Sequence, residues 1–110
     1  MEPFPEILLE GTLRKESRYL SRWRTRWFVL TRTSLCSYKR KGDTITTEKI
    51  DLVDCVAVIG AEHITGEETS FALKTWDRTF LLVAPTLKDK DRWQMMISKL
   101  MVQRAPFHED

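Results

Sequence analysis

The chain has 110 residues and a mass of 13.0 kDa, and 42% of its residues are hydrophobic, which suits one domain with a single core and leaves no room for a second. It contains no run of about 18 apolar residues such as a membrane-spanning helix requires. Its first ten residues, MEPFPEILLE, lack the basic start and apolar stretch of a signal peptide, so we expect a cytoplasmic protein.

Basic residues are concentrated in one part of the chain. Residues 11–41 hold ten lysines and arginines against one acid, a net charge of +9, whereas the rest holds eight against fifteen, a net charge of −7. A chain divided in this way predicts one face directed at an anionic partner rather than an evenly basic surface.

Alternating hydrophobicity predicts seven strands, separated by turn-forming residues such as Gly42, Gly60 and Gly66. In chain order we expect the strands at residues 7–15, 23–31, 34–40, 46–52, 55–59, 70–75 and 78–83. Seven short strands at this spacing are typical of an antiparallel sandwich or barrel, a mainly β fold.

After Pro85 the hydrophobic period changes from that of a strand to that of a helix. Thr86, with Asp89 three residues later, predicts an N-terminal cap. The apolar residues that follow share one helical face: Trp93, Met96, Ile97, Leu100 and Met101. We expect this helix to close an open end of the barrel, with Trp93 as a core anchor. The predicted domain spans residues 7–104, between an extension at 1–6 and a tail at 105–110.

The residues that most often carry chemistry are few. Cys36 and Cys55 form no CxxC pair, so we expect two reduced thiols packed like small hydrophobic residues, with no disulfide framework and no bound metal. His63 and His108 have no nucleophile or carboxylate pair that the fold would bring to them, and phosphate-loop and dinucleotide motifs are missing. We therefore expect neither an enzyme nor a cofactor.

Three arginines interrupt an otherwise strand-like sequence, RWRTRWFVL, at residues 22–30. Arg22, Arg24 and Arg26 occupy every second position, so in a strand they lie on the same face as Phe28 and Leu30. Adjacent like charges are unfavourable unless water or an anion compensates them. The spacing therefore predicts an anion-binding face.

An antiparallel hairpin of the first two strands would gather basic residues at its loop end. Lys15 then leaves the first strand beside Arg24 and Arg26, at positions that share the inward-facing parity. The third strand would bring Lys39 to the same end. We expect a basic mouth formed by these four side chains, in which apolar walls strengthen the field and forked arginine donors match phosphate oxygens.

These positions resemble those of a pleckstrin homology (PH) domain over nearly the whole chain. The resemblance rests on the motif EGxLxK at residues 10–15, on WRxRWFVL at 23–30 and on Trp93 in the C-terminal helix. It implies a seven-stranded, strongly bent antiparallel sandwich capped by that helix. In the family, a lysine followed by a variable loop and Lys/Arg-x-Arg marks members that bind inositol phosphate headgroups, and Lys15, Arg24 and Arg26 fill these places.

The loop spacing is most similar to that of the N-terminal PH module of the protein kinase B group. That resemblance implies a set of phosphate contacts and one loop-supporting residue: Lys15, Arg24, Arg26, Lys39 and Arg78, with Tyr19 in the loop. Arg18 stands where that group usually has an acid, so we expect stronger attraction to anionic headgroups in general and weaker selectivity for a 3-phosphorylated lipid. Tyr19 and Leu20 would either enter the bilayer interface or fold back on the barrel.

The resemblance implies a phosphoinositide-binding module that recruits its parent protein to the cytoplasmic face of membranes, chiefly the plasma membrane. Soluble inositol phosphates would bind at the same place, and an anionic membrane surface would add attraction. Two alternatives stay open: a PH-like module that binds a protein or peptide, and a tether to anionic membranes without headgroup specificity. We do not expect a nucleic-acid ligand, because Trp23 and Trp27 fall on the opposite strand face from the arginines at 24 and 26.

Overall fold

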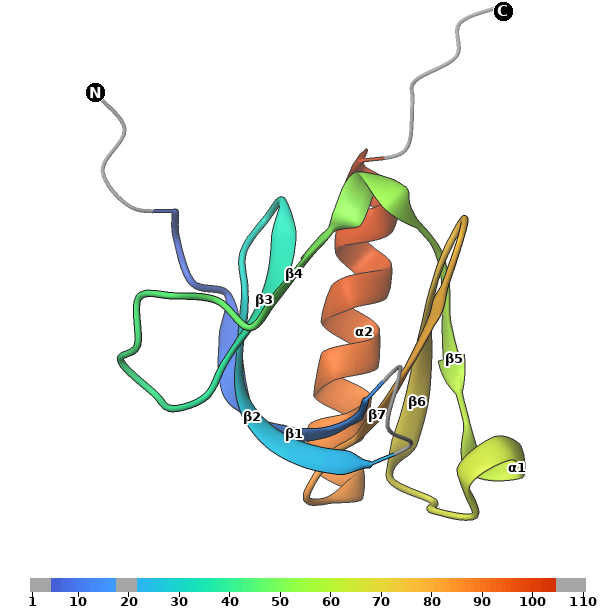
Figure 1. The fold of residues 1–110 in the computed structure, drawn as a ribbon. Helices are drawn as coiled ribbons and strands as arrows, with labels where there is room; N and C mark the ends of the chain where they lie inside the picture. Colours follow the sequence, from blue (N-terminus) through green and yellow to red (C-terminus); the bar gives the residue numbers. More distant parts are fainter. Residues whose placement is uncertain (1–4, 18–21, 105–110) are drawn as a thin grey trace, which may run out of the picture.

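Seven antiparallel strands form one bent, open sheet, and a long C-terminal helix lies against it (Figure 1). The structure is a computed structural model that describes residues 5–17 and 22–104. The strands are β1 (Leu9–Glu16), β2 (Trp23–Leu30), β3 (Ser34–Tyr38), β4 (Glu48–Asp51), β5 (Cys55–Gly60), β6 (Ser70–Thr75) and β7 (Thr79–Val83). Their order in the sheet is β4-β3-β2-β1-β7-β6-β5, so β4 and β5 are its edges.

The predicted fold class is confirmed, and all seven predicted strands are present with small differences at their ends. Two short helical segments were not predicted: a 3-10 turn η1 (Leu52–Asp54) and a single turn α1 (Glu62–Thr65). One turn is too short to show a helical period. It ends at Gly66, whose φ of 79° is a conformation that glycine adopts without steric cost.

The hairpin of β1 and β2 has the parity that the sequence predicts. Opposite residues form four inward-facing rows, from the core toward the β1–β2 loop: Leu9 with Leu30, Gly11 with Phe28, Leu13 with Arg26, and Lys15 with Arg24. Leu13, Phe28 and Leu30 are buried. Each row lies two residues further along both strands, so the inward face changes from apolar to basic within the hairpin.

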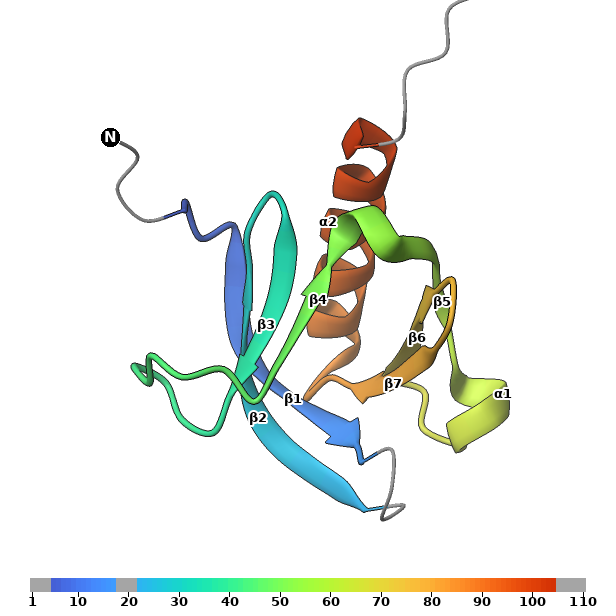
Figure 2. The same cartoon turned by 45° about the horizontal axis from the view of Figure 1, so that its top comes forward.

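The long helix α2 (Leu87–Arg104) begins at the predicted cap. The Thr86 hydroxyl accepts a hydrogen bond from the Asp89 backbone N–H at 3.1 Å and donates to the Asp89 carboxylate at 3.0 Å. Trp93, Ile97 and Leu100 are buried in the core, as the periodicity predicts. Both views place α2 between the edge strands β4 and β5 (Figures 1 and 2). In the described ranges, no helix is long and apolar enough to cross a membrane.

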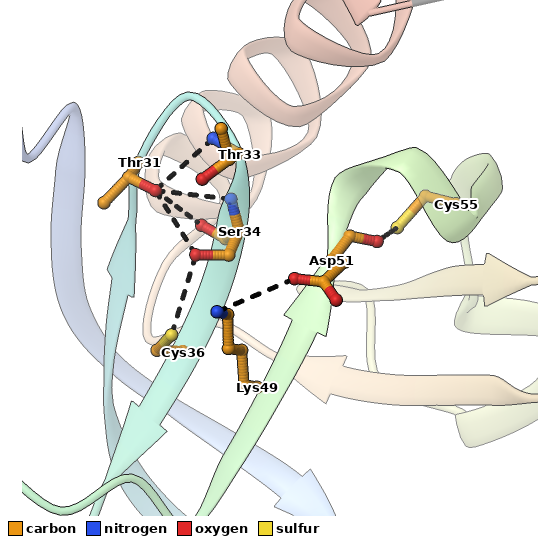
Figure 3. Close-up of polar contacts among 7 residues, drawn as sticks. All are labelled: Thr31, Thr33, Ser34, Cys36, Lys49, Asp51 and Cys55. Carbon is orange, nitrogen blue, oxygen red and sulfur yellow. Dashed lines mark hydrogen bonds and ion pairs between the residues drawn. The ribbon is translucent and has the colours of Figure 1, made fainter. Parts of the chain in front are cut away.

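The turn between β2 and β3 is held by a side chain rather than by glycine. Thr31 Oγ1 accepts from the backbone N–H groups of Thr33 and Ser34 at 3.4 and 3.3 Å (Figure 3). The Ser34 hydroxyl also lies 3.7 Å from the Cys36 thiol, which is free, as is that of Cys55. This turn lies at the opposite end of β2 from the β1–β2 loop. It therefore joins β2 to β3 without contacting the end of β2 that carries Arg24 and Arg26.

Candidate anion-binding site

A basic cleft opens where β1 ends and β2 begins. It has a volume of about 420 Å³ and is lined by Lys15, Ser17, Arg24, Arg26, Thr47, Glu48 and Arg78. These residues come from β1, from β2, from the start of β4 and from the turn between β6 and β7, and none comes from α2. The cleft therefore lies within the bent sheet, at the loop end of its central hairpin.

The register of the sheet explains why the cations lie here. Arg26 is opposite buried Leu13, and Lys15 is opposite Arg24 in the next row outward. The side chains of these rows point to the same side of the sheet as the core; Arg26 lies at the margin of the core, beside Leu13, and Lys15 and Arg24 lie one row beyond it. Their charged ends therefore face the cleft, while their backbones belong to the same regular hairpin as the core.

Glu48 links two of the cations in this cleft. One of its carboxylate oxygens accepts from Lys15 Nζ, and the other accepts from the Arg78 guanidinium at 2.7 Å. The side chains of Lys15, Glu48 and Arg78 are only 16%, 20% and 20% exposed, so water screens this bridge less than it would screen a surface pair. Arg78 also stacks over the ring of Phe80, 4.0 Å from its centroid, which restricts the guanidinium further.

Arg24 and Arg26 differ from the bridged cations. Within residues 5–17 and 22–104, neither forms an ion pair, and the Arg26 guanidinium donates only to the neighbouring carbonyl of Thr25, at 3.1 Å. Among the described residues, the cleft thus contains four cations and one carboxylate. Two cations are bridged by that carboxylate, and two have donors available to an incoming anion.

The structure brings together four of the seven side chains singled out from the sequence: Lys15, Arg24, Arg26 and Arg78. Lys39 does not line this cleft, because β3 ends at Tyr38 and the chain then turns away in the β3–β4 loop. Lys39 lines a neighbouring cavity of about 620 Å³ formed by that loop, which adjoins the cleft at Thr47. Arg18 and Tyr19, with Leu20, lie outside the described residues.

The sequence analysis missed three lining residues, Ser17, Thr47 and Glu48, of which only Glu48 is charged. It lies opposite Ser37 in the pairing of β4 with β3, and Ser37 lies opposite Phe28 in the pairing of β3 with β2. The signal was present in the sequence, since Glu48 shares its parity with the buried Ile50 two positions later. Parity alone would have placed an acid on the inward face.

The two tryptophans of β2 contact charged side chains on the other face of the hairpin. The Arg14 guanidinium lies 5.7 Å from the Trp23 ring, and the Lys41 ammonium lies 5.3 Å from that of Trp27. The Trp27 indole N–H donates to Glu10 at 3.1 Å. Both rings thus pack on neighbouring side chains of the sheet surface.

Comparison with known proteins agrees with this architecture. The family model of the PH domain matches residues 7–102. Pleckstrin homology domain-containing protein 1 of Arabidopsis thaliana is 33% identical over 100 residues, which cover 86% of this chain and 69% of that protein. The dual adapter for phosphotyrosine and 3-phosphotyrosine and 3-phosphoinositide of Mus musculus is 33% identical over 84 residues, 76% of this chain. The matched segment spans only 30% of that adapter's length.

A solved structure matches over most of the fold. The C-terminal PH domain of pleckstrin, in complex with D-myo-Ins(1,2,3,5,6)P5, has a TM-score of 0.78 and 27% identity, and the match covers 89% of this chain and 98% of that one. The PH domain is a binding module rather than a catalytic fold, whatever the activity of the protein that contains it. From the family match and the seven-stranded sheet with its C-terminal helix, we conclude that this chain belongs to the PH domain family.

Proposed function

We propose that this domain binds the phosphorylated inositol headgroup of a phosphoinositide lipid and thereby recruits its parent protein to the cytoplasmic face of a membrane, chiefly the plasma membrane. The observation that carries the proposal is the convergence of Lys15, Arg24, Arg26 and Arg78 on one cleft. A cleft of about 420 Å³ is within the usual range of small-molecule sites.

The chemistry of the cleft suits a phosphorylated ring. Each guanidinium offers a fork of N–H donors that can pair with two phosphate oxygens. The Lys15 ammonium offers three donors to further phosphate oxygens. The buried rows beneath, which include Leu13 and Phe28, provide apolar walls that strengthen these charges. Binding and release of the headgroup require no reaction of the protein.

Two of the compared proteins support this choice of ligand. The pleckstrin domain that matches this fold holds an inositol pentakisphosphate, and the name of the mouse adapter includes a 3-phosphoinositide. Soluble inositol phosphates should therefore bind in the same cleft. The excess of positive charge in residues 11–41 would add attraction to an anionic leaflet, about 1 kcal/mol for each charge close to the surface.

Calorimetric titration with soluble inositol phosphates tests the proposal. The ligands would differ only in their 3-, 4- and 5-phosphates, at physiological salt concentration. We expect Arg26→Ala to weaken binding by about 10- to 100-fold, because it removes a charge-assisted contact from the cleft. Arg14→Ala is the matched control, since Arg14 belongs to the same hairpin but pairs with Glu67 at 3.3 Å on the outer face.

Two results would contradict the proposed function. If the folded wild-type domain bound none of the ligands, the basic cleft would be a non-specific membrane tether or a protein-docking face. If Arg26→Ala retained wild-type affinity while remaining folded, the headgroup would bind elsewhere on the domain.

A further inference from the structure

Glu48 is the one acid among the described residues that line the cleft. Its two carboxylate oxygens are both engaged, one by Lys15 and the other by Arg78. An anion that approached these two cations would meet a negative charge already in place. This carboxylate therefore divides the cleft into two sides. Arg24 and Arg26 form the available side, and Lys15 and Arg78 form the side that Glu48 occupies.

We propose that Glu48 is an internal competitor for phosphate, which occupies the Lys15 and Arg78 side of the cleft in the free domain and is displaced when a headgroup binds. This inference rests on the proposed function and assigns a specificity-determining residue to the same cleft. A ligand with one phosphate can bind at Arg24 and Arg26 without disturbing the bridge. A ligand with several phosphates can reach the second side only by replacing the carboxylate.

The position of Glu48 makes such a replacement feasible. It is the first residue of β4 and follows directly on the loop at residues 39–47, so its side chain is not enclosed on all sides. Phosphate and carboxylate use the same forked oxygen geometry toward guanidinium, and phosphate has the higher charge and one more oxygen. A phosphate thus satisfies the donors of Lys15 and Arg78 and leaves the Glu48 carboxylate to water.

This arrangement has a consequence for ligand choice. Displacing Glu48 costs the free energy of its ion pairs with Lys15 and Arg78. Weakly charged ligands therefore gain little affinity by binding to these two cations. Each added phosphate makes the exchange more favourable. Glu48 should therefore raise the number of phosphates that a ligand needs for tight binding, and its loss should benefit highly phosphorylated ligands most.

The experiment compares Glu48→Gln with wild type by calorimetric titration, using inositol 1-phosphate, inositol 1,4,5-trisphosphate and inositol 1,3,4,5-tetrakisphosphate. Glutamine keeps the size of the side chain and removes its charge. We expect the affinity for the two polyphosphates to rise on the order of tenfold, with a smaller change for the monophosphate. Glu67→Gln is the matched control: it removes the same charge from the ion pair with Arg14 on the outer face, and its affinities should stay close to wild type.

The outcomes separate this inference from the proposed function. Tighter polyphosphate binding by Glu48→Gln, but not by Glu67→Gln, supports the competitor role. Equal or weaker binding by a folded Glu48→Gln domain, beside a wild type that binds, overturns the competitor role alone, because a residue that merely orients Lys15 and Arg78 would lose affinity on substitution. Absence of binding by both proteins overturns the proposed function and the inference together. Glu48→Ala, which also removes the carboxylate, should agree in direction.

Discussion

Cys55 shows how the chemistry of one side chain depends on its neighbours. The thiol is half-buried at the start of β5 and donates to the Asp51 carbonyl at 3.7 Å (Figure 3). Burial, followed by the negative charges of Asp54 and Asp51, raises the pKa of the Cys55 thiol from 9.0 to about 11. The thiolate is the reactive form of cysteine, so Cys55 should be inert at physiological pH.

This leads to a prediction about pH. In a Cys36→Ser variant, alkylation of Cys55 by iodoacetamide should be slow at pH 8 and should rise with a midpoint near pH 11. Because the folded domain keeps a proton that the unfolded chain releases from pH 9 upward, the contribution of this thiol to stability is present below pH 9 and is lost as the pH rises toward 11. The control is the same variant unfolded in urea, in which the alkylation midpoint should lie near pH 9. An alkylation midpoint near pH 9 in the folded domain would show that burial does not raise the pKa of this thiol.

The residues of the cleft differ in how far sequence reasoning could reach them. Lys15, Arg24 and Arg26 belong to one hairpin, so strand parity and a short loop suffice to bring them together. Arg78 comes from another part of the chain and was identified only through the family resemblance. The bridge from Glu48 to Lys15 and Arg78 joins three separate segments, and this depends on how the whole sheet bends.

At the scale of elements, boundary signals were most reliable where a side chain interacts with the backbone close by. Helix α2 begins where Thr86 and Asp89 predict, because this capping involves residues only three positions apart. The strand predicted at 46–52 was longer than β4, since its last residue enters η1 and its first two precede the ladder. Pairing with β3 sets those ends, and a single strand's sequence contains no information about its partner.

The cap of α2 can be tested directly. Thr86→Ala should lower the free energy of unfolding by about 1 kcal/mol, because the N–H of Asp89 loses its acceptor. Urea denaturation followed by tryptophan fluorescence would measure the change. Ser98→Ala, which removes a hydroxyl from an exposed position of the same helix, should leave stability unchanged or slightly higher. Equal stability of Thr86→Ala and wild type would show that the cap is dispensable.

At the scale of the whole molecule, the cleft and the loop beside it suggest how the domain would meet a bilayer. Ile45 in the β3–β4 loop is 82% exposed and lines the cavity that adjoins the cleft. An apolar side chain this exposed is favoured at a membrane interface. A headgroup held in the cleft would bring this loop close to the lipids from which the headgroup projects.

A prediction for membrane binding follows from this orientation. Ile45→Ser should weaken binding to vesicles containing phosphoinositide by about 3- to 10-fold, because less apolar area enters the interface. Its affinity for a soluble inositol phosphate should not change. Vesicle sedimentation and calorimetry would provide the two measurements.

Val102→Ser, which changes an exposed apolar residue of α2, is the control and should behave as wild type in both. An equal loss of vesicle and soluble-ligand binding by Ile45→Ser would instead mean that the loop shapes the cleft.

The change from apolar to basic rows along the β1–β2 hairpin separates positions that support folding from positions that line the cleft. Leu13 is buried, whereas Lys15 and Arg24, one row further out, support no part of the core. Under the proposed function, substitution of Arg24 in this outer row would alter which anion is preferred at little cost to folding, whereas substitution of buried Leu13, one row inward, would affect folding itself. A lineage of such domains can therefore diversify its ligands through a few rim positions and inherit the scaffold unchanged.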